Sequence, residues 1–322
     1  MEISPEVVAA KEALEGPLLQ AGLITGVDFG LRDEETPDPE DLALRIFVAD
    51  AESVPFEVQA AVDTFPFPVV VIQRVFQLTA QLPDTTRFRP VMGGSSVAAS
   101  RFVATGSVHV GTLGAVVQDS LDPSIFYGLS NFHVLCVDPN RAVGDEIVQP
   151  EPSPLGSLPG DRIGTLADWS FPENTPSGPV DAAICRLELD SVPEIVDIGP
   201  VFKTVDATPG MLVTKRGRTT GQTFGIVTGT GLSVILDFPA FPAVGFVPTT
   251  LRTFTNQIHI RADFPQSIVF GESGDSGSLV VGPDNRAVGL YFASGSTSLG
   301  DPLRFGVASP AAVVETELGI TF

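Results

Sequence analysis

Beyond about residue 100 the sequence is a succession of short apolar runs, each closed by a cluster of Gly, Pro, Asn or Asp. GTLGAVVQD, IFYGLSNFHVL, DAAICRLEL, QIHIRADF and RAVGLYFAS are examples, all rich in β-branched or aromatic residues. The chain holds 32 Gly and 28 Pro among its 322 residues, which favours many tight turns over long helices. Strands at this spacing predict a mainly β barrel or sandwich of about 220 residues.

The first 80 residues follow a different pattern. Residues 5–15 and 54–65 have apolar side chains at helical spacing, and three apolar runs at 21–31, 41–49 and 66–76 are typical of strands. This order predicts a compact α-β-β-α-β unit. The sequence therefore predicts a small α/β accessory or pro-region-like domain over 1–81, a Pro- and Gly-bearing linker over 82–100 and a β domain over 101–322.

The charge of the chain excludes some classes of partner. The formal net charge is −21, and residues 1–60 carry 14 acidic against 3 basic residues. No basic stripe is present to neutralise phosphates, so we expect no nucleic-acid partner. No run has the roughly 18 uncharged apolar residues of a membrane span, so we expect no membrane partner either.

The N-terminal residues and the cysteines bear on location. MEISPEVVAAKEALEG has no basic stretch followed by an apolar one, so it does not resemble a signal peptide. We therefore expect a cytoplasmic protein, with an unconventional export route left open. Without an export signal, Cys136 and Cys185 are expected to be free buried thiols.

Residues 270–280, FGESGDSGSLV, place Ser276 between an acid and a glycine just before an apolar run. Such a turn either reverses the chain or exposes a hydroxyl beside two backbone N–H groups. A nucleophilic serine needs a base, and the chain has three histidines. His259 alternates with apolar neighbours in NQIHIRADF, which predicts an exposed strand face. His109 is expected to be structural.

His133 follows an apolar run in FYGLSNFHVLC, where packing can hold its ring. A catalytic base also needs a carboxylate to orient it. Asp181 begins the apolar run of PVDAAICRLEL and is the candidate that stands out. Each residue alone also has an ordinary explanation, His133 as a core histidine and Asp181 as a turn cap. The other aspartates considered are Asp145, Asp161, Asp168, Asp190 and Asp197.

Taken together, FYGLSNFHVLC, PVDAAICRL and GESGDSGSLV resemble the His, Asp and Ser blocks of the chymotrypsin/trypsin-like serine proteases. They occur in that order, with 48 and then 95 residues between the key positions. LSNFHVL is similar to the histidine block of the bacterial branch. VTKRGRTTGQTFGIV is similar to a strand pair of the alpha-lytic protease and streptogrisin group. The resemblance covers roughly residues 88–310 and implies two six-stranded antiparallel β-barrels.

The resemblance implies a role for each matching residue. Ser276 is the nucleophile, His133 the general base and then the acid, and Asp181 the residue that orients His133. The N–H groups of Gly274 and Ser276 form the oxyanion hole. Asp275 is expected to pair with a basic residue of KRGR, Lys215 above all, so that the site forms without proteolytic activation.

Two departures from the family pattern concern the turn and the substrate pocket. Ser278 stands where the family has a second glycine. Phe270 stands where trypsin-like enzymes carry a selecting acid, which argues against Arg or Lys specificity. Phe292, Ala293 and Ser294 are expected to line the pocket beside Phe270, for an apolar or small side chain.

The function expected from the resemblance is that of a serine endopeptidase with a polypeptide substrate and no metal or organic cofactor. The alternative is a binding or scaffold protein that keeps the fold with an occluded cleft. An esterase is disfavoured because Ser276 is not in a G-x-S-x-G elbow. The N-terminal unit resembles bacterial protease pro-regions in size and element order only. Folding assistance, cover of the cleft, partner binding and a plain accessory role all stay open for it.

Overall fold

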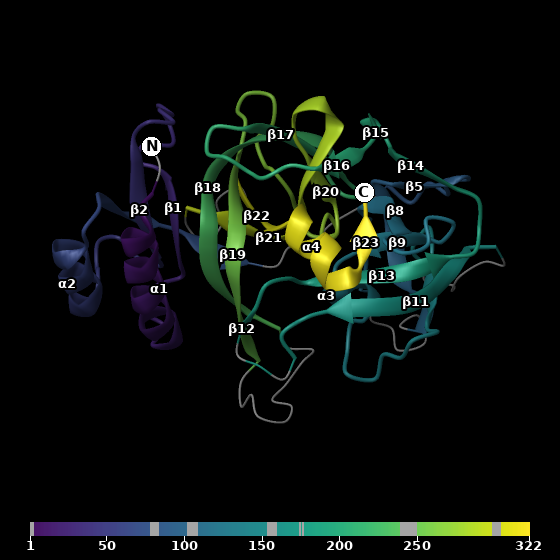
Figure 1. Ribbon diagram of the computed structural model, residues 1–322, viewed down its shortest axis with the longest axis horizontal. Coiled ribbons are helices and arrows are strands. Elements are labelled where there is room, and N and C mark those ends of the chain that lie inside the picture. The colour runs from purple at the N-terminus through teal and green to yellow at the C-terminus, as the bar shows by residue number, and fades with distance from the viewer. Residues whose placement is uncertain are drawn as a thin grey trace.

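The computed structural model describes most of the chain, in eight segments. They are residues 3–77, 84–101, 109–152, 160–173, 175, 177–238, 250–297 and 304–322. Strands dominate, and a small helix-bearing unit precedes them, so the predicted mainly β fold with an N-terminal α/β unit is confirmed. Figure 1 shows the N-terminal unit on the left, one β region in the centre and a second on the right.

The N-terminal unit has the predicted order of elements. Helix α1 runs five residues beyond the predicted end at residue 15. Its N-cap is Ser4, whose hydroxyl accepts from the Val7 N–H. Pro5 in the first turn fits a helix start because its missing N–H has no intrahelical acceptor there. The elements are α1 (Pro5–Gln20), β1 (Gly26–Leu31), β2 (Leu42–Val48), α2 (Phe56–Thr64), β3 (Val69–Gln73) and β4 (Val75–Gln77).

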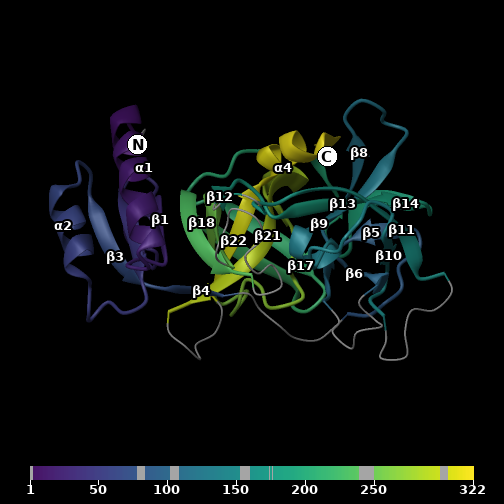
Figure 2. The same ribbon diagram turned by 90° about the horizontal axis from the view of Figure 1, so that it is seen from below.

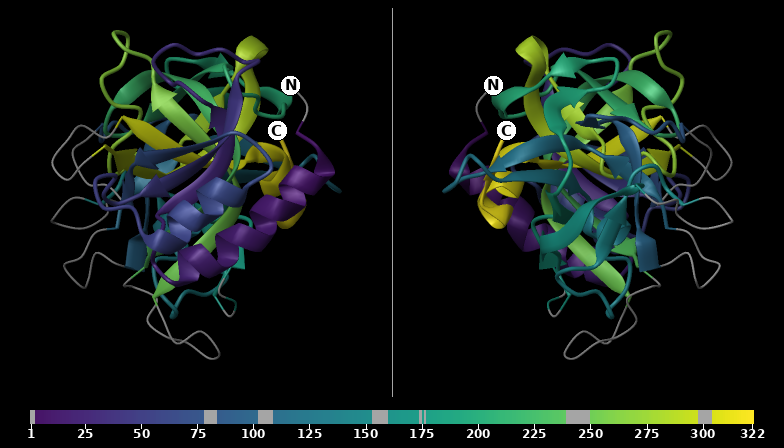
Figure 3. Two further views of the ribbon diagram at one scale, coloured as in Figure 1. Left: turned by 90° about the vertical axis from the view of Figure 1, so that its left-hand side faces the viewer. Right: turned by 90° about the vertical axis from the view of Figure 1, so that its right-hand side faces the viewer.

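Both helices of this unit lie on its outer side, as the left view of Figure 3 shows. Their apolar faces and strands β1 to β3 enclose a core of their own, which includes Leu19, Val27, Ile46 and Val58. The opposite end of the unit is not a free edge. β1 pairs antiparallel with β18 (Gly221–Asp237), with Gly26 opposite Val234. The N-terminal strands therefore continue the sheet of the central β region.

The central β region is built on this large sheet. Within the described residues the sheet has twelve strands, ordered β12-β19-β22-β21-β20-β17-β18-β1-β2-β3, and β4 and β16 both pair with β21. The remaining members are β12 (Ser177–Gly178), β16 (Phe202–Thr204), β17 (Leu212–Gly217), β19 (Leu251–Ala262), β20 (Leu279–Val281), β21 (Arg286–Ser296) and β22 (Phe305–Pro310).

The second β region contains an eight-stranded sheet in the described residues, ordered β23-β8-β9-β13-β11-β10-β6-β7, and a three-stranded sheet ordered β15-β14-β5. Its first strands are β5 (Val91–Gly93), β6 (Ser95–Ala99), β7 (Gly111–Leu113), β8 (Ala115–Asp119) and β9 (Phe126–Ser130). The later ones are β10 (Glu146–Val148), β11 (Arg162–Ser170), β13 (Ala182–Leu187), β14 (Ser191–Ile195), β15 (Gly199–Pro200) and β23 (Ile320–Thr321).

Two short helices lie with these sheets. Helix α3 (Phe132–Leu135) follows β9, and helix α4 (Ala311–Leu318) packs through Ala311 and Val314 into the core shared by β8, β13 and β21. A one-turn 3₁₀ helix, η2 (Pro283–Asn285), leads into β21. The resemblance implied two six-stranded barrels. In the described residues one main sheet has twelve strands, of which β1 to β4 come from the N-terminal unit, and the other has eight.

The predicted linker over 82–100 needs a correction at its C-terminal end. Residues 91–99 form β5 and β6, which pair with β14, β7 and β10. The Gly93-Gly94 pair in this segment permits close packing of β5. A Cβ on Gly93 would lie 2.5 Å from the Gly114 carbonyl oxygen. The β region therefore begins before residue 101.

The expectation of an exposed His259 was wrong. The side chain is fully buried, although Ile258 and Ile260 occupy the other face of β19 as the alternation predicts. The N-terminal unit covers this face. Arg45 from β2 donates to Asp28 at 2.6 Å, and Arg74 donates to His259 Nε2 at 3.1 Å and to Glu34 at 2.8 Å. A buried cluster of two acids, two arginines and one histidine thus joins the two parts.

Other expectations concern the cysteines and membranes. Cys136 and Cys185 are free and buried, as predicted, and burial raises the pKa of Cys185 to about 12. Within the residues that the structure describes, none of the helices is long and apolar enough to cross a bilayer.

Candidate active site

Strand pairing brings His133 and Asp181 together. β9 and β13 are antiparallel, with Ser130 opposite Ala183. Continuing that register by two residues places Asp181 opposite Phe132, next to His133 in helix α3. Asp181 therefore lies at the start of one strand while His133 lies just after the end of its neighbour. Two residues 48 positions apart in sequence become neighbours through one ladder.

Asp181 contacts His133 through both carboxylate oxygens. Oδ2 lies 2.5 Å from Nδ1 of the ring, and Oδ1 accepts from the His133 backbone N–H at 3.1 Å. The Asp181 carbonyl accepts from the Asn131 side chain at 2.6 Å. Asp181 is fully buried, whereas the His133 side chain is 19% exposed. An Nδ1–H that donates to Asp181 leaves Nε2 without its proton, so Nε2 can accept one.

Ser276 lies in a tight turn between two glycines with positive φ. Gly274 has φ +91° and Gly277 has φ +94°, a region that other residues rarely adopt. The turn is fixed by backbone bonds from Asp275 N–H to the Glu272 carbonyl and from Gly277 N–H to the Tyr291 carbonyl. Ser276 itself is 5% exposed.

The turn that carries Ser276 lies against the elements that carry His133. A Cβ on Gly111 would lie 2.4 Å from a Val134 methyl group and 2.7 Å from the Ser276 carbonyl oxygen. A Cβ on Gly277 would lie 2.2 Å from the Ser130 hydroxyl. Ser130 and Val134 flank His133 in sequence. The turn that carries Ser276 and the segment that carries His133 therefore meet across β7, at positions where only glycine leaves room.

Thr112 in β7 makes two hydrogen bonds to the turn that carries Ser276. Its N–H donates to the Ser276 carbonyl at 2.8 Å, and its hydroxyl donates to the Gly274 carbonyl at 2.8 Å. The same hydroxyl accepts from the Arg218 N–H at 3.0 Å. Thr112 holds the carbonyl oxygens of Gly274 and Ser276 on the β7 side of the turn. Sequence analysis missed this residue, because SVHVGTL contains no motif that marks it.

The backbone N–H groups of Gly274 and Ser276 are available for a ligand. Among the described residues, neither donates to a protein acceptor, whereas Asp275, Gly277 and Ser278 in the same turn all do. These two N–H groups lie on either side of Asp275 in sequence, and both can donate to an oxyanion as it develops in a transition state.

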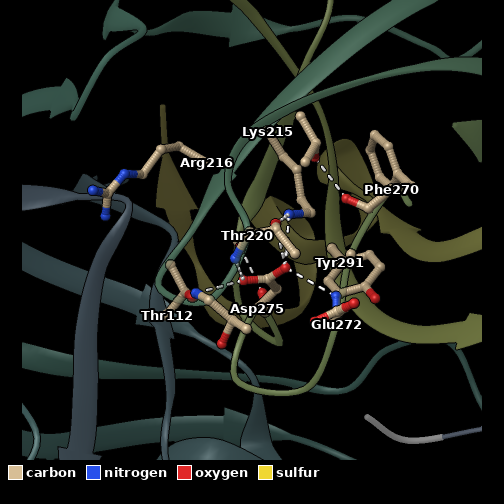
Figure 4. A network of polar contacts seen from close by, with 12 residues as sticks. Thr112, Lys215, Arg216, Thr220, Phe270, Glu272, Asp275 and Tyr291 are labelled. Carbon is tan, nitrogen blue, oxygen red and sulfur yellow. Dashed lines mark hydrogen bonds and ion pairs between the residues drawn. The ribbon is translucent and has the colours of Figure 1, made fainter. Parts of the chain in front are cut away.

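The side chain of Asp275 is buried and is bound by donors of the β17–β18 hairpin. Oδ2 accepts from Lys215 Nζ at 3.0 Å and from the Thr220 hydroxyl at 2.6 Å. Oδ1 accepts from the N–H groups of Thr219 and Thr220 at 2.9 and 3.1 Å. Figure 4 shows the carboxylate between these groups, with the Glu272 N–H as a further donor at 3.0 Å.

This set of donors controls the charge of Asp275. Burial alone would raise its pKa, but the Lys215 ammonium and the Thr220 hydroxyl hold the pKa of Asp275 below its ordinary value. Burial lowers the pKa of Lys215, and Asp275 opposes that shift. Both are fully buried, so each compensates the charge of the other. In the described part of the chain, Lys215 is the cation of this pair.

The two arginines of KRGR bind other carboxylates. Arg216 pairs with Asp84, and Arg218 pairs with Glu151. Arg218 also lies behind Gly274, where a Cβ would come 2.7 Å from its guanidinium. Lys215 and Arg218 of the β17–β18 hairpin thus contact the turn that carries Ser276, whereas Arg216 contacts Gly94 and Asp84.

The residues predicted to line the substrate pocket are buried in the structure. Phe270 is fully buried against Tyr291, in space that Gly225 and Gly306 leave for its ring. Ser294 contacts the Tyr291 hydroxyl and donates to the Gly271 carbonyl at 2.9 Å. Phe292 and Ala293 are also buried. Their contact with substrate stays a prediction.

Among the described residues, no three His, Cys, Asp or Glu side chains are arranged to hold a metal ion. The polar groups gathered here are instead a serine hydroxyl, an imidazole paired with a carboxylate, and two free N–H donors. That combination can activate a serine for attack on a carbonyl carbon and stabilise the oxyanion that results.

No model of a known protein family matches the chain, and no curated protein matches it in sequence. The solved structures that it resembles are chymotrypsin-like bacterial serine proteases. Thermobifida fusca protease A is 16% identical over 72% of this chain and 97% of that one, with a TM-score of 0.47. Cellulomonas bogoriensis chymotrypsin is 19% identical over 72% and 97%, with a TM-score of 0.47. A glutamic-acid-specific serine protease is 20% identical over 72% and 99%, with a TM-score of 0.48.

Proposed function

We propose that this chain is a serine endopeptidase that acts on polypeptides through Ser276, His133 and Asp181. The observation that carries the proposal is the hydrogen-bonded pair of His133 and Asp181 next to a turn that presents Ser276 with two free N–H groups. No metal or organic cofactor takes part in the proposed reaction.

In the proposed reaction, Ser276 Oγ attacks the carbonyl carbon of a peptide bond while His133 Nε2 takes the hydroxyl proton. The carbonyl oxygen becomes an oxyanion and is bound by the Gly274 and Ser276 N–H groups. His133 then gives the proton to the departing amine as the C–N bond breaks. Water then attacks the acyl carbon while His133 takes its proton, and His133 returns that proton to Ser276 Oγ as the acyl–Oγ bond breaks. Asp181 keeps Nδ1 protonated and stabilises the imidazolium.

Labelling with a fluorophosphonate probe tests whether Ser276 is activated. The probe is expected to modify Ser276, as located by mass spectrometry, and labelling is expected to disappear in Ser276→Ala and His133→Ala. Ser273→Ala, in the same turn, is the matched control and is expected to label normally. Absence of labelling in the folded parent chain would favour the scaffold protein over the enzyme.

Asp181→Asn separates the orienting role from the nucleophile. The amide keeps the size of the carboxylate but favours the wrong imidazole tautomer, so we expect the acylation rate to fall about 10⁴-fold. Asp168→Asn, an exposed aspartate on β11, is the control and is expected to leave the rate unchanged. A comparison of peptide amides with simple esters then distinguishes an endopeptidase from an esterase.

A further inference from the structure

Strand β21 continues past the turn that carries Ser276. β20 and β21 are antiparallel, with Leu279 opposite Leu290 and Val280 opposite Gly289. The Gly277 N–H donates to the Tyr291 carbonyl, so the pairing reaches the turn. Continuing the register places Ser276 beside residue 293. Beyond residue 293 the segment that carries Ser276 no longer pairs with β21. The edge of β21 that pairs with β20 continues as far as Ser296.

The N-terminal unit occupies this stretch of edge. β4 pairs antiparallel with β21, with Gln77 opposite Ser294 and Val75 opposite Ser296. β22 takes the other edge of β21 at these positions, so β4 lies on the edge that β20 leaves free. Figure 2 shows β4 reaching from the N-terminal unit to the end of β21. β4 runs toward the turn, and Gln77 ends one register position from Ser276.

Two sets of contacts hold β4 in this place. The ring of Phe76 is 8% exposed and packs edge-on against Phe47 and His259, with centroids 5.6 Å away in each case. Arg74, just before β4, is part of the buried charge cluster. β4 is therefore fixed by the core of the N-terminal unit as well as by the ladder.

The chain is anchored again on the far side of the turn. Asp84 forms an ion pair with Arg216, and its N–H donates to the Arg218 carbonyl at 2.6 Å. Arg218 lies behind Gly274. Only six residues separate Gln77 from Asp84. The two anchored ends of this segment thus flank the turn that carries Ser276.

An extended peptide binds a free sheet edge by adding a strand, and its main chain supplies most of the hydrogen bonds. The edge of β21 at 294–296 leads directly to Ser276, so it is where a peptide substrate of the proposed endopeptidase would pair. We propose that β4 is a tethered competitor for this edge, so that the resting chain excludes extended peptides from its own active site. This proposal rests on the proposed function.

The test measures peptide binding in a chain that cannot turn over. The probe is a fluorescein-labelled peptide with the sequence of residues 73–77, Gln-Arg-Val-Phe-Gln, added to full-length Ser276→Ala. In this background, Val75→Pro removes a backbone N–H from β4 and disfavours its pairing with β21. Phe76→Ser removes the apolar side chain that packs β4 against the N-terminal unit. We expect peptide affinity to rise about tenfold or more, since the edge becomes free for a larger fraction of the time.

Phe56→Ser in the same background is the matched control, because Phe56 is 82% exposed and begins helix α2 on the outer side of the N-terminal unit. It is expected to leave peptide affinity unchanged. If the double change prevents a cooperative melt, Val75→Pro alone is measured, since it removes no fully buried side chain.

Hydrogen exchange at residues 294–296 gives an independent readout. The amides in this stretch that face β4 rather than β22 are expected to be protected in the parent and to lose protection in the β4 variants. Unprotected amides in the parent, or unchanged peptide affinity in the variants, would overturn the proposal. Neither readout depends on catalysis. Failure of fluorophosphonate labelling would overturn the proposed function separately.

Discussion

The Asp275 carboxylate and the Lys215 ammonium lie 3.0 Å apart, both fully buried, directly beside the candidate nucleophile. The pair links the Ser276 turn to β17, because Lys215 lies on that strand, 60 residues before Asp275 in sequence. Since Thr219 and Thr220 complete the shell of Asp275, one hairpin supplies four of the donors that fix this side chain.

Lys215→Met is expected to destabilise the chain by about 3–5 kcal/mol, because it leaves the Asp275 charge buried without a cation. The urea midpoint of unfolding measures this loss. Adding Asp275→Asn removes the remaining charge and should restore part of the stability. Lys203→Met, at an exposed lysine, is the control. Equal midpoints for Lys215→Met and Lys203→Met would show that the pair contributes nothing.

The same variant has a predicted pH dependence. In the parent the pKa of Asp275 is lowered, so its stabilisation is present above the unfolded value of 3.8 and is lost as pH falls below it. Without Lys215 the pKa of Asp275 rises, and protonation then relieves the penalty. The stability difference between Lys215→Met and the parent should therefore shrink as the pH falls toward 4. A constant difference would contradict this.

Thr112→Val is expected to reduce kcat about tenfold with little change in KM. The substitution keeps the shape but removes the hydroxyl that holds the Gly274 carbonyl, so the Gly274 N–H is positioned less well for the oxyanion. Thr112→Ser should restore the rate. Thr214→Val removes a comparable bond to the Thr223 carbonyl and is the control. A similar loss of kcat in both valine variants would indicate a general structural effect.

Gly277→Ala and Gly144→Ala separate backbone strain from crowding. Both positions have positive φ, +94° and +98°, so each substitution should cost about 1–2 kcal/mol of conformational energy. A Cβ at Gly277 also meets the Ser130 hydroxyl and the Thr112 carbonyl, whereas a Cβ at Gly144 meets nothing within 4 Å. Only Gly277→Ala is expected to abolish fluorophosphonate labelling, with a larger fall in melting temperature.

His259 makes stability depend on pH. Burial, and then the Arg74 guanidinium, lower its pKa to about 4 from an ordinary value of 6.5. The unfolded chain therefore binds more protons between these values, so stability should fall as pH decreases from 6.5 toward 4 and stay flat above 6.5. We expect a loss of about 2 kcal/mol between pH 7 and pH 5, measured by urea unfolding.

His259→Gln is the comparison for this effect. Asp28, Glu34, Arg45 and Arg74 face His259 from the N-terminal unit and stay charged over this range, because the pKa values of both acids are lowered. The variant should therefore lose most of the dependence between pH 7 and pH 5. An equal slope in parent and variant would assign the dependence to other groups.

Local sequence patterns predicted helices and strands correctly where the neighbouring residues in sequence decide the structure. The alternation around His259 identified the correct strand, and the order of elements in the N-terminal unit was confirmed. Whether a strand face is exposed depends on what packs over it. The exposure of His259 was therefore mispredicted, because β1, β2 and Arg74 arrive from more than 180 residues away.

For the candidate site too, local sequence patterns do not show which distant residues pack together. His133, Asp181 and Ser276 were selected because they lie in recognisable blocks, and the structure places their segments together. Their catalytic roles stay predictions until labelling is measured. Gly111 and Thr112 belong to the same contact region, but a glycine and a threonine in an ordinary strand carry no local mark. Their importance comes from atoms across the interface, at Val134 and Ser276.

Because β1 pairs with β18, hydrolysis of a peptide bond between Gln77 and Asp84 would not by itself release the N-terminal unit. The N-terminal unit is joined to the remainder by a main-chain ladder, by β4 on β21 and by the buried charges around His259. None of these contacts depends on the covalent connection. A nicked molecule would therefore persist as a two-fragment complex, and its fragments would separate only under conditions that melt the shared sheet.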